Sequence, residues 1–111
     1  MKGLGNIGNL GAIMKQAQQV MQQSQEVERE LSETRIEATS GGGMVRATVT
    51  GRGEVLEIKI DPQVVDPSDV QMLEDLVVSA IREATERAQA IRNEKVKELT
   101  GGLGIGDMFG V

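Results

Sequence analysis

The sequence contains no cysteine and no histidine. These absences exclude disulfide bonds, thiolate or imidazole metal sites, a cysteine nucleophile and any catalytic triad with a histidine base. We therefore expect neither a metal ion nor a cofactor. The lack of cysteine is also typical of a protein that resides in a reducing compartment.

Aromatic residues are almost absent, since Phe109 is the only one among 111 residues. Aromatic side chains bury the most area per residue, so the core has to be built from Val, Ile, Leu, Met and Ala. Hydrophobic residues make up 39% of the chain, so the core of a monomer would be marginal. A core shared with a second copy of the chain would be more stable. No apolar run approaches the ~20 residues of a membrane span and no signal peptide is visible, which predicts a cytoplasmic protein without membrane contact.

Two segments have the hydrophobic periodicity of long helices. The first runs from about residue 9 to residue 35 and carries a heptad seam. The seam residues are Leu10, Ile13, Ala17, Val20, Ser24, Val27 and Leu31. The second helix follows residues 66–69, where Asp66 or Ser68 would cap it, and ends near Thr100-Gly101.

Between these helices the pattern changes to strict alternation interrupted by glycines. Residues 36–39, 45–50 and 56–60 are predicted strands, joined by turns at 41–43 and 51–53. We expect one face of the sheet to be apolar and to contain Val45, Ala47, Val49, Leu56, Ile58 and Ile60. The sequence thus predicts a single α+β domain over residues 1–111, with a long helix, a three-stranded antiparallel sheet and a second long helix. Its glycine-rich ends, residues 1–8 and 101–111, are predicted to be flexible.

The predicted helices are too long for one compact globule. They would measure ~37 and ~45 Å, whereas a globule of this chain length has a diameter of roughly 35 Å. The apolar stripes of the two helices must be buried against each other and against a partner chain, which predicts a two-fold homodimer. The alternative is a monomeric helical hairpin with a sheet at one end.

Motifs for catalysis are weak or missing. Residues 3–8 match G-x-G-x-x-G, but only two residues precede this segment, so the strand that a dinucleotide-binding loop requires is absent. The carboxylates lie among arginines and lysines on predicted helix surfaces, where solvated ion pairs are the better interpretation. The sequence therefore predicts a protein that is not an enzyme and has no small-molecule substrate.

The distribution of charge gives a local signal for a polyanionic partner, although the net charge of −5 weighs against one. One group of cations lies on the predicted helices: Lys15, Arg82, Arg87, Arg92, Lys95 and Lys97. A second group, Arg46, Arg52 and Lys59, lies on the outward face and a turn of the sheet. Ordinary solvated surface charge is the alternative interpretation of both groups.

In the order and spacing of four short segments, the sequence resembles the YbaB/EbfC family of bacterial nucleoid-associated proteins. The resemblance is carried by residues 14–19 (MKQAQQ), 43–49 (GMVRATV), 57–62 (EIKIDP) and 72–76 (MLEDL). It implies a dimer whose helices protrude like the arms of tweezers, and binding to duplex DNA in the nucleoid with weak sequence preference.

From charge and exposure we predict that the helical arms contact DNA phosphates through Lys15, Arg82, Arg87, Arg92 and Lys95. The sheet face with Arg46, Arg52 and Lys59 is the second candidate. A protein–protein adaptor with Met- and Gln-rich helical surfaces is the alternative function.

Overall fold

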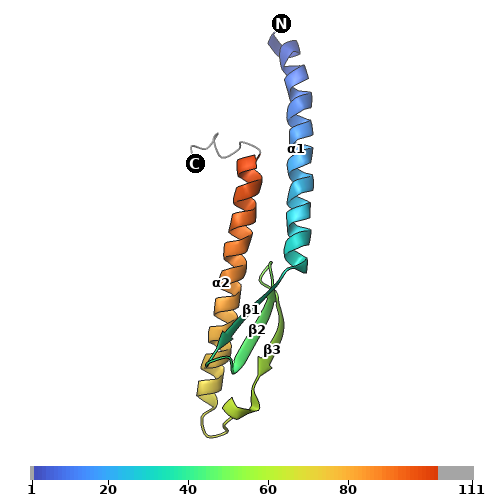
Figure 1. The fold of residues 1–111 in the computed structure, drawn as a ribbon. Coiled ribbons are helices and arrows are strands. Elements are labelled where there is room, and N and C mark those ends of the chain that lie inside the picture. The colour runs from blue at the N-terminus through green and yellow to red at the C-terminus, as the bar shows by residue number, and fades with distance from the viewer. Residues whose placement is uncertain (1, 103–111) are drawn as a thin grey trace.

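The computed structural model describes the backbone of residues 2–102 and the side chains of residues 9–99. Helix α1 (Lys2–Glu33) is followed by strands β1 (Arg35–Ser40), β2 (Val45–Thr50) and β3 (Val55–Ile60). A short 3-10 helix, η1 (Pro62–Val64), leads to helix α2 (Val70–Gly102) (Figure 1). The predicted α+β order of helix, three-stranded antiparallel sheet and helix is confirmed.

The start of α1 differs from the prediction. The helix begins at Lys2, whereas the periodicity placed its start near Asn9 and predicted an irregular lead-in. A glycine inside a helix costs only about 1 kcal/mol relative to alanine, so the glycines of this segment are a much weaker stop signal than a proline. The predicted flexible tail from residue 103 onward lies outside the described residues.

The cap of α2 also differs from the prediction. Asp69 caps the helix, since its Oδ1 accepts a hydrogen bond from the backbone amide of Met72 at 3.2 Å. Asp66 and Ser68, the predicted caps, instead form the preceding turn, in which Asp66 Oδ1 accepts from the amide of Ser68 at 2.9 Å and from its hydroxyl at 2.7 Å. These two hydrogen bonds lower the pKa of Asp66.

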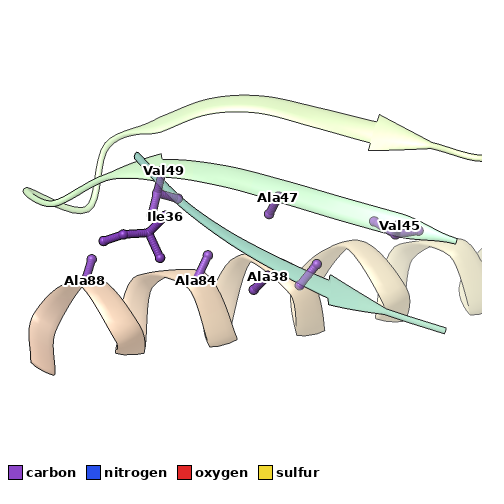
Figure 2. Close-up of a cluster of buried hydrophobic side chains, with 8 residues drawn as sticks. Ile36, Ala38, Val45, Ala47, Val49, Ala84 and Ala88 are labelled. Atoms are coloured by element: carbon purple, nitrogen blue, oxygen red, sulfur yellow. The ribbon is translucent and has the colours of Figure 1, made fainter. Parts of the chain in front are cut away.

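One face of the sheet packs on α2 and forms the core (Figure 2). The strands have the order β1-β2-β3, with both pairs antiparallel. As predicted, Val45, Ala47 and Val49 are all buried on this face. On the helix side the buried residues are alanines four apart, Ala80, Ala84 and Ala88, whose small side chains allow α2 to lie close to the sheet.

A β-bulge in the β2–β3 pair corrects the predicted face of Leu56. Thr48 pairs with Glu57 and Val49 with Val55, so that Leu56 is the extra residue. Leu56 was predicted to face the core, but it is 48% exposed and lines a shallow hollow on the opposite face together with Thr48 and Glu57. The alternation fails here because Leu56 is itself the inserted residue, so that Val55 rather than Leu56 lies opposite Val49.

Helix α1 joins the sheet only near its C-terminal end. Leu31 is 0% exposed, and the backbone amide of Gly51 donates to the Leu31 carbonyl oxygen at 2.8 Å. Beyond this joint the N-terminal part of α1 extends past the end of α2 (Figure 1). The chain measures 80 × 26 × 17 Å with a radius of gyration of 21.7 Å, against about 13 Å for a compact globule of its length.

Candidate nucleic-acid interface

The projecting part of α1 leaves most of the predicted seam uncovered. Leu10 and Ile13 are 54% and 60% exposed, Ala17 is also exposed, and Val20 is half-buried. Only toward the joint does the chain cover its own seam, where Val27 is half-buried and Leu31 is fully buried. Residues 9–99, whose side chains the structure describes, therefore leave much of the apolar stripe of this long helix uncovered.

The same part of α1 has an unusual charge pattern. No aspartate or glutamate precedes Glu26, although the whole chain has 17 carboxylate side chains. Lys15 is exposed on this segment and forms no ion pair with any described residue. Six glutamines between residues 16 and 25 supply hydrogen-bond donors without negative charge. This segment is therefore cationic within a protein that is anionic overall.

The four predicted cations of α2 lie in different environments. Arg82 is exposed and has no ion-pair partner among the described residues. Arg87 pairs with Glu83 one helical turn earlier at 2.7 Å, and it donates to the backbone oxygen of Glu37 on β1 at 2.8 Å. The guanidinium of Arg87 therefore also ties α2 to the edge of the sheet.

Arg92 and Lys95 pair with carboxylates of α1. Arg92 Nη2 lies 2.8 Å from Glu28 Oε1, and Lys95 Nζ lies 3.1 Å from Glu30 Oε2. Arg52 Nε, from the turn between β2 and β3, lies 3.4 Å from Glu28 Oε2. The structure thus groups Arg92, Lys95 and Arg52 at the inner side of α1, while Lys15 lies farther out along the arm.

The second candidate face is only partly assembled. Arg46 and Lys59 are cross-strand partners on the face of the sheet opposite α2. Lys59 lies 3.8 Å from Glu57, and Arg46 has no ion-pair partner among the described residues. Arg52 does not join them, because it pairs with Glu28 at the joint of α1.

Sequence reasoning missed two features of these surfaces. Arg35 lies at the start of β1, where it lines a hollow of about 320 Å³ on the outer sheet face with Glu37 and Thr48. Its place in the alternation of β1 could have identified it. The pairing of Glu28 and Glu30 with α2 had no local signal, because these contacts span 64 and 65 residues.

Other kinds of site find no support in the described part of the chain. No group of three or more potential ligands could hold a metal ion there. Neither α1 nor α2, over the residues described, has an apolar stretch long enough to cross a membrane.

Comparison with known proteins identifies a family for this chain. Residues 6–103 match the model of the YbaB/EbfC DNA-binding family. A nucleoid-associated protein of Clostridium acetobutylicum is 47% identical over 103 residues, which cover 93% of this chain and 91% of that protein. A nucleoid-associated protein of Rhodococcus jostii is 45% identical over 107 residues, covering 96% and 95% of the two chains.

A solved structure shares the fold. The crystal structure of an uncharacterized protein from Helicobacter pylori superimposes with a TM-score of 0.69 at 21% sequence identity, covering 81% of this chain and 91% of that one. The family is a DNA-binding family without enzymatic activity, in agreement with the prediction that the chain is not an enzyme. Because the family model and relatives above 40% identity both cover nearly its whole length, the chain belongs to the YbaB/EbfC DNA-binding family.

Proposed function

We propose that this protein is a nucleoid-associated protein that binds duplex DNA mainly through phosphate contacts, with weak sequence preference. The observation that carries the proposal is the projecting segment of α1, which has no carboxylate before Glu26. Family membership and the names of the bacterial relatives support the same function and a place in the nucleoid.

The segregation of charge answers the main objection to DNA binding, which is the net charge of −5. Affinity for the DNA backbone depends on the cations that reach phosphates, and carboxylates elsewhere on the molecule oppose it less when they are more than about 10 Å away. The carboxylate-free part of α1, residues 2–25, is ~36 Å long, about one helical turn of B-DNA. A straight helix of this length can follow the duplex surface.

The proposed contacts are Lys15, Arg82, Arg87, Arg92 and Lys95. Lys15 and Arg82 are available for phosphates without breaking an ion pair with a described residue. Glutamine amides along α1 supply further hydrogen bonds to phosphate oxygens. Such contacts carry no information on base sequence, which is why the proposed preference is weak.

We further propose that the protein acts as a homodimer with protruding helical arms. The uncovered stripe of Leu10, Ile13 and Ala17 needs a partner, and a second copy supplies an identical stripe. Two copies also duplicate each cationic group, so modest contacts from the two arms combine on one duplex.

One observation favours the adaptor as a second candidate function. Met14 and Met21 are 59% and 64% exposed beside the seam, and exposed methionines suit a surface that accepts the helix of another protein. Salt separates the two functions, because phosphate binding weakens steeply with added salt whereas apolar docking does not.

The test is fluorescence anisotropy of labelled duplexes with several unrelated sequences, titrated with purified protein at four salt concentrations. We expect similar dissociation constants on all sequences. We also expect a linear fall of log affinity with log salt, with a slope of about −0.9 for each phosphate contacted. Absence of binding to any duplex at low salt would overturn the proposal and favour the adaptor.

A further inference from the structure

Two glutamates of α1 link this helix to the basic part of α2. Glu28 accepts from Arg92 Nη2 at 2.8 Å and lies 3.4 Å from Arg52 Nε, while Glu30 accepts from Lys95 Nζ at 3.1 Å. Arg92 and Lys95 belong to the proposed DNA contacts, so half of the cations proposed on α2 are occupied by carboxylates of α1.

These ion pairs are accessible to solvent and reversible. The side chains of Arg92 and Glu28 are 41% and 39% exposed, and those of Lys95 and Glu30 are 31% and 45% exposed. Pairs exposed to this degree contribute little to stability and are weakened by salt. A competing anion of higher charge density can therefore displace either carboxylate without disrupting the core.

A DNA phosphate is such an anion. Its oxygens accept the same charge-assisted hydrogen bonds as a carboxylate, and arginine binds both through its planar guanidinium. Each exchange releases Glu28 or Glu30 from its cation and brings in a phosphate oxygen, with no covalent change.

We propose that Glu28 and Glu30 are inhibitory carboxylates that compete with DNA for Arg92 and Lys95. This inference rests on the proposed function and adds regulation to the same site. Of the five proposed contacts, Lys15 and Arg82 bind phosphates directly, and Arg92 and Lys95 bind them only after Glu28 and Glu30 are displaced. Arg87 is paired within α2 with Glu83 and is not part of this competition. The wild-type protein therefore has fewer effective phosphate contacts than its cations would allow.

The test compares two double variants that remove the same number of carboxylates. Glu28→Gln with Glu30→Gln frees the two cations. Glu86→Gln with Glu94→Gln removes two exposed carboxylates of α2 that pair with no described residue. Dissociation constants are measured by anisotropy over a salt series, with circular dichroism melting to compare folding. The single variant Glu30→Gln, which frees Lys95 alone, serves as a milder form.

We expect the Glu28/Glu30 variant to bind roughly three- to tenfold more tightly than the Glu86/Glu94 variant at low salt. Its salt slope should be steeper than the wild-type slope by about 0.9 for each freed cation that reaches a phosphate, whereas the control slope should equal the wild-type slope. Glu30→Gln should give about half of the change in slope.

Equal affinities and parallel slopes for the two double variants, with wild-type binding intact, would overturn the inhibitory role alone. If neither the wild type nor any variant binds DNA at low salt, the proposed function fails and this inference fails with it. If the Glu28/Glu30 variant is unfolded, an unchanged slope in folded Glu30→Gln overturns the proposal.

Discussion

The backbone amide of Gly51 donates a hydrogen bond to the carbonyl oxygen of Leu31 across 2.8 Å, which ties the turn between β2 and β3 to the last turns of α1. The same amide lies 3.1 Å from the carbonyl oxygen of Thr34. Together with the burial of Leu31, this contact fixes the direction in which α1 leaves the sheet. The position of the projecting arm thus depends on a close approach of two backbone segments.

Replacing Gly51 with alanine should destabilise the protein. A Cβ at this position would lie 2.8 Å from the Leu31 carbonyl oxygen and 2.9 Å from its Cδ2 atom, so backbone has to move. We expect a loss of about 1–3 kcal/mol in the free energy of unfolding, measured by chemical denaturation. Gly11→Ala is the control, because nothing lies within 4 Å of its added Cβ and the helix should tolerate or favour it. Equal stability of the two variants would contradict the close packing of this joint.

Enlarging an alanine between α2 and the sheet should also be costly. Ala84 is 0% exposed in the layer of alanines that faces β1 and β2. Ala84→Leu should lower the free energy of unfolding by about 1–3 kcal/mol, because the helix has to move away from the sheet. Ala90→Leu, on the exposed face of the same helix, should change stability by less than about 0.5 kcal/mol. The prediction fails if thermal melting shows no difference between them.

If the protein is a homodimer, its mass in solution should be twice that of the chain and should depend on the side chain of Ile13. Light scattering at micromolar concentration should give twice the 11.9 kDa mass of the chain. Ile13→Asp places a charge on the uncovered seam and should shift the protein toward the monomer. Gln22→Asp, on the opposite side of α1, adds the same charge and should leave the mass unchanged. A monomer mass for the wild type would exclude the dimer, and an unchanged dimer in Ile13→Asp would place its interface elsewhere.

Periodicity predicted the elements of this fold well because each side-chain pattern is local. The buried face of β2 follows directly from the alternation of Val45, Ala47 and Val49. The alternation could not locate the bulge at Leu56, since the inserted residue is defined only by pairing with β2. The cap of α2 was misassigned because Asp66, Ser68 and Asp69 are all suitable caps, and the geometry of the preceding turn decides among them.

The candidate site was less predictable than the fold. Its cations are visible in the sequence, and their exposure on α1 and α2 agrees with the helical pattern. Whether a cation is available depends on contacts between distant segments, as the pairing of Glu28 with Arg92 illustrates. From the sequence of α2 alone, Arg82 and Arg92 look equally available to a phosphate. In the structure, Arg92 is paired with a carboxylate of α1 and Arg82 is not.

The central claim is that DNA binds to the helical arms, and its most direct test compares Lys15→Gln with Arg46→Gln. Both variants remove one exposed cation that pairs with no described residue, the first from the projecting part of α1 and the second from the outer sheet face. Dissociation constants on unrelated duplexes are measured over a salt series.

Binding through the arms predicts that Lys15→Gln weakens affinity roughly three- to tenfold on every duplex and flattens the salt slope by about 0.9 per lost contact, while Arg46→Gln binds as the wild type does. The opposite result, with Arg46→Gln weakened and Lys15→Gln unchanged, would contradict the account and place the DNA on the sheet.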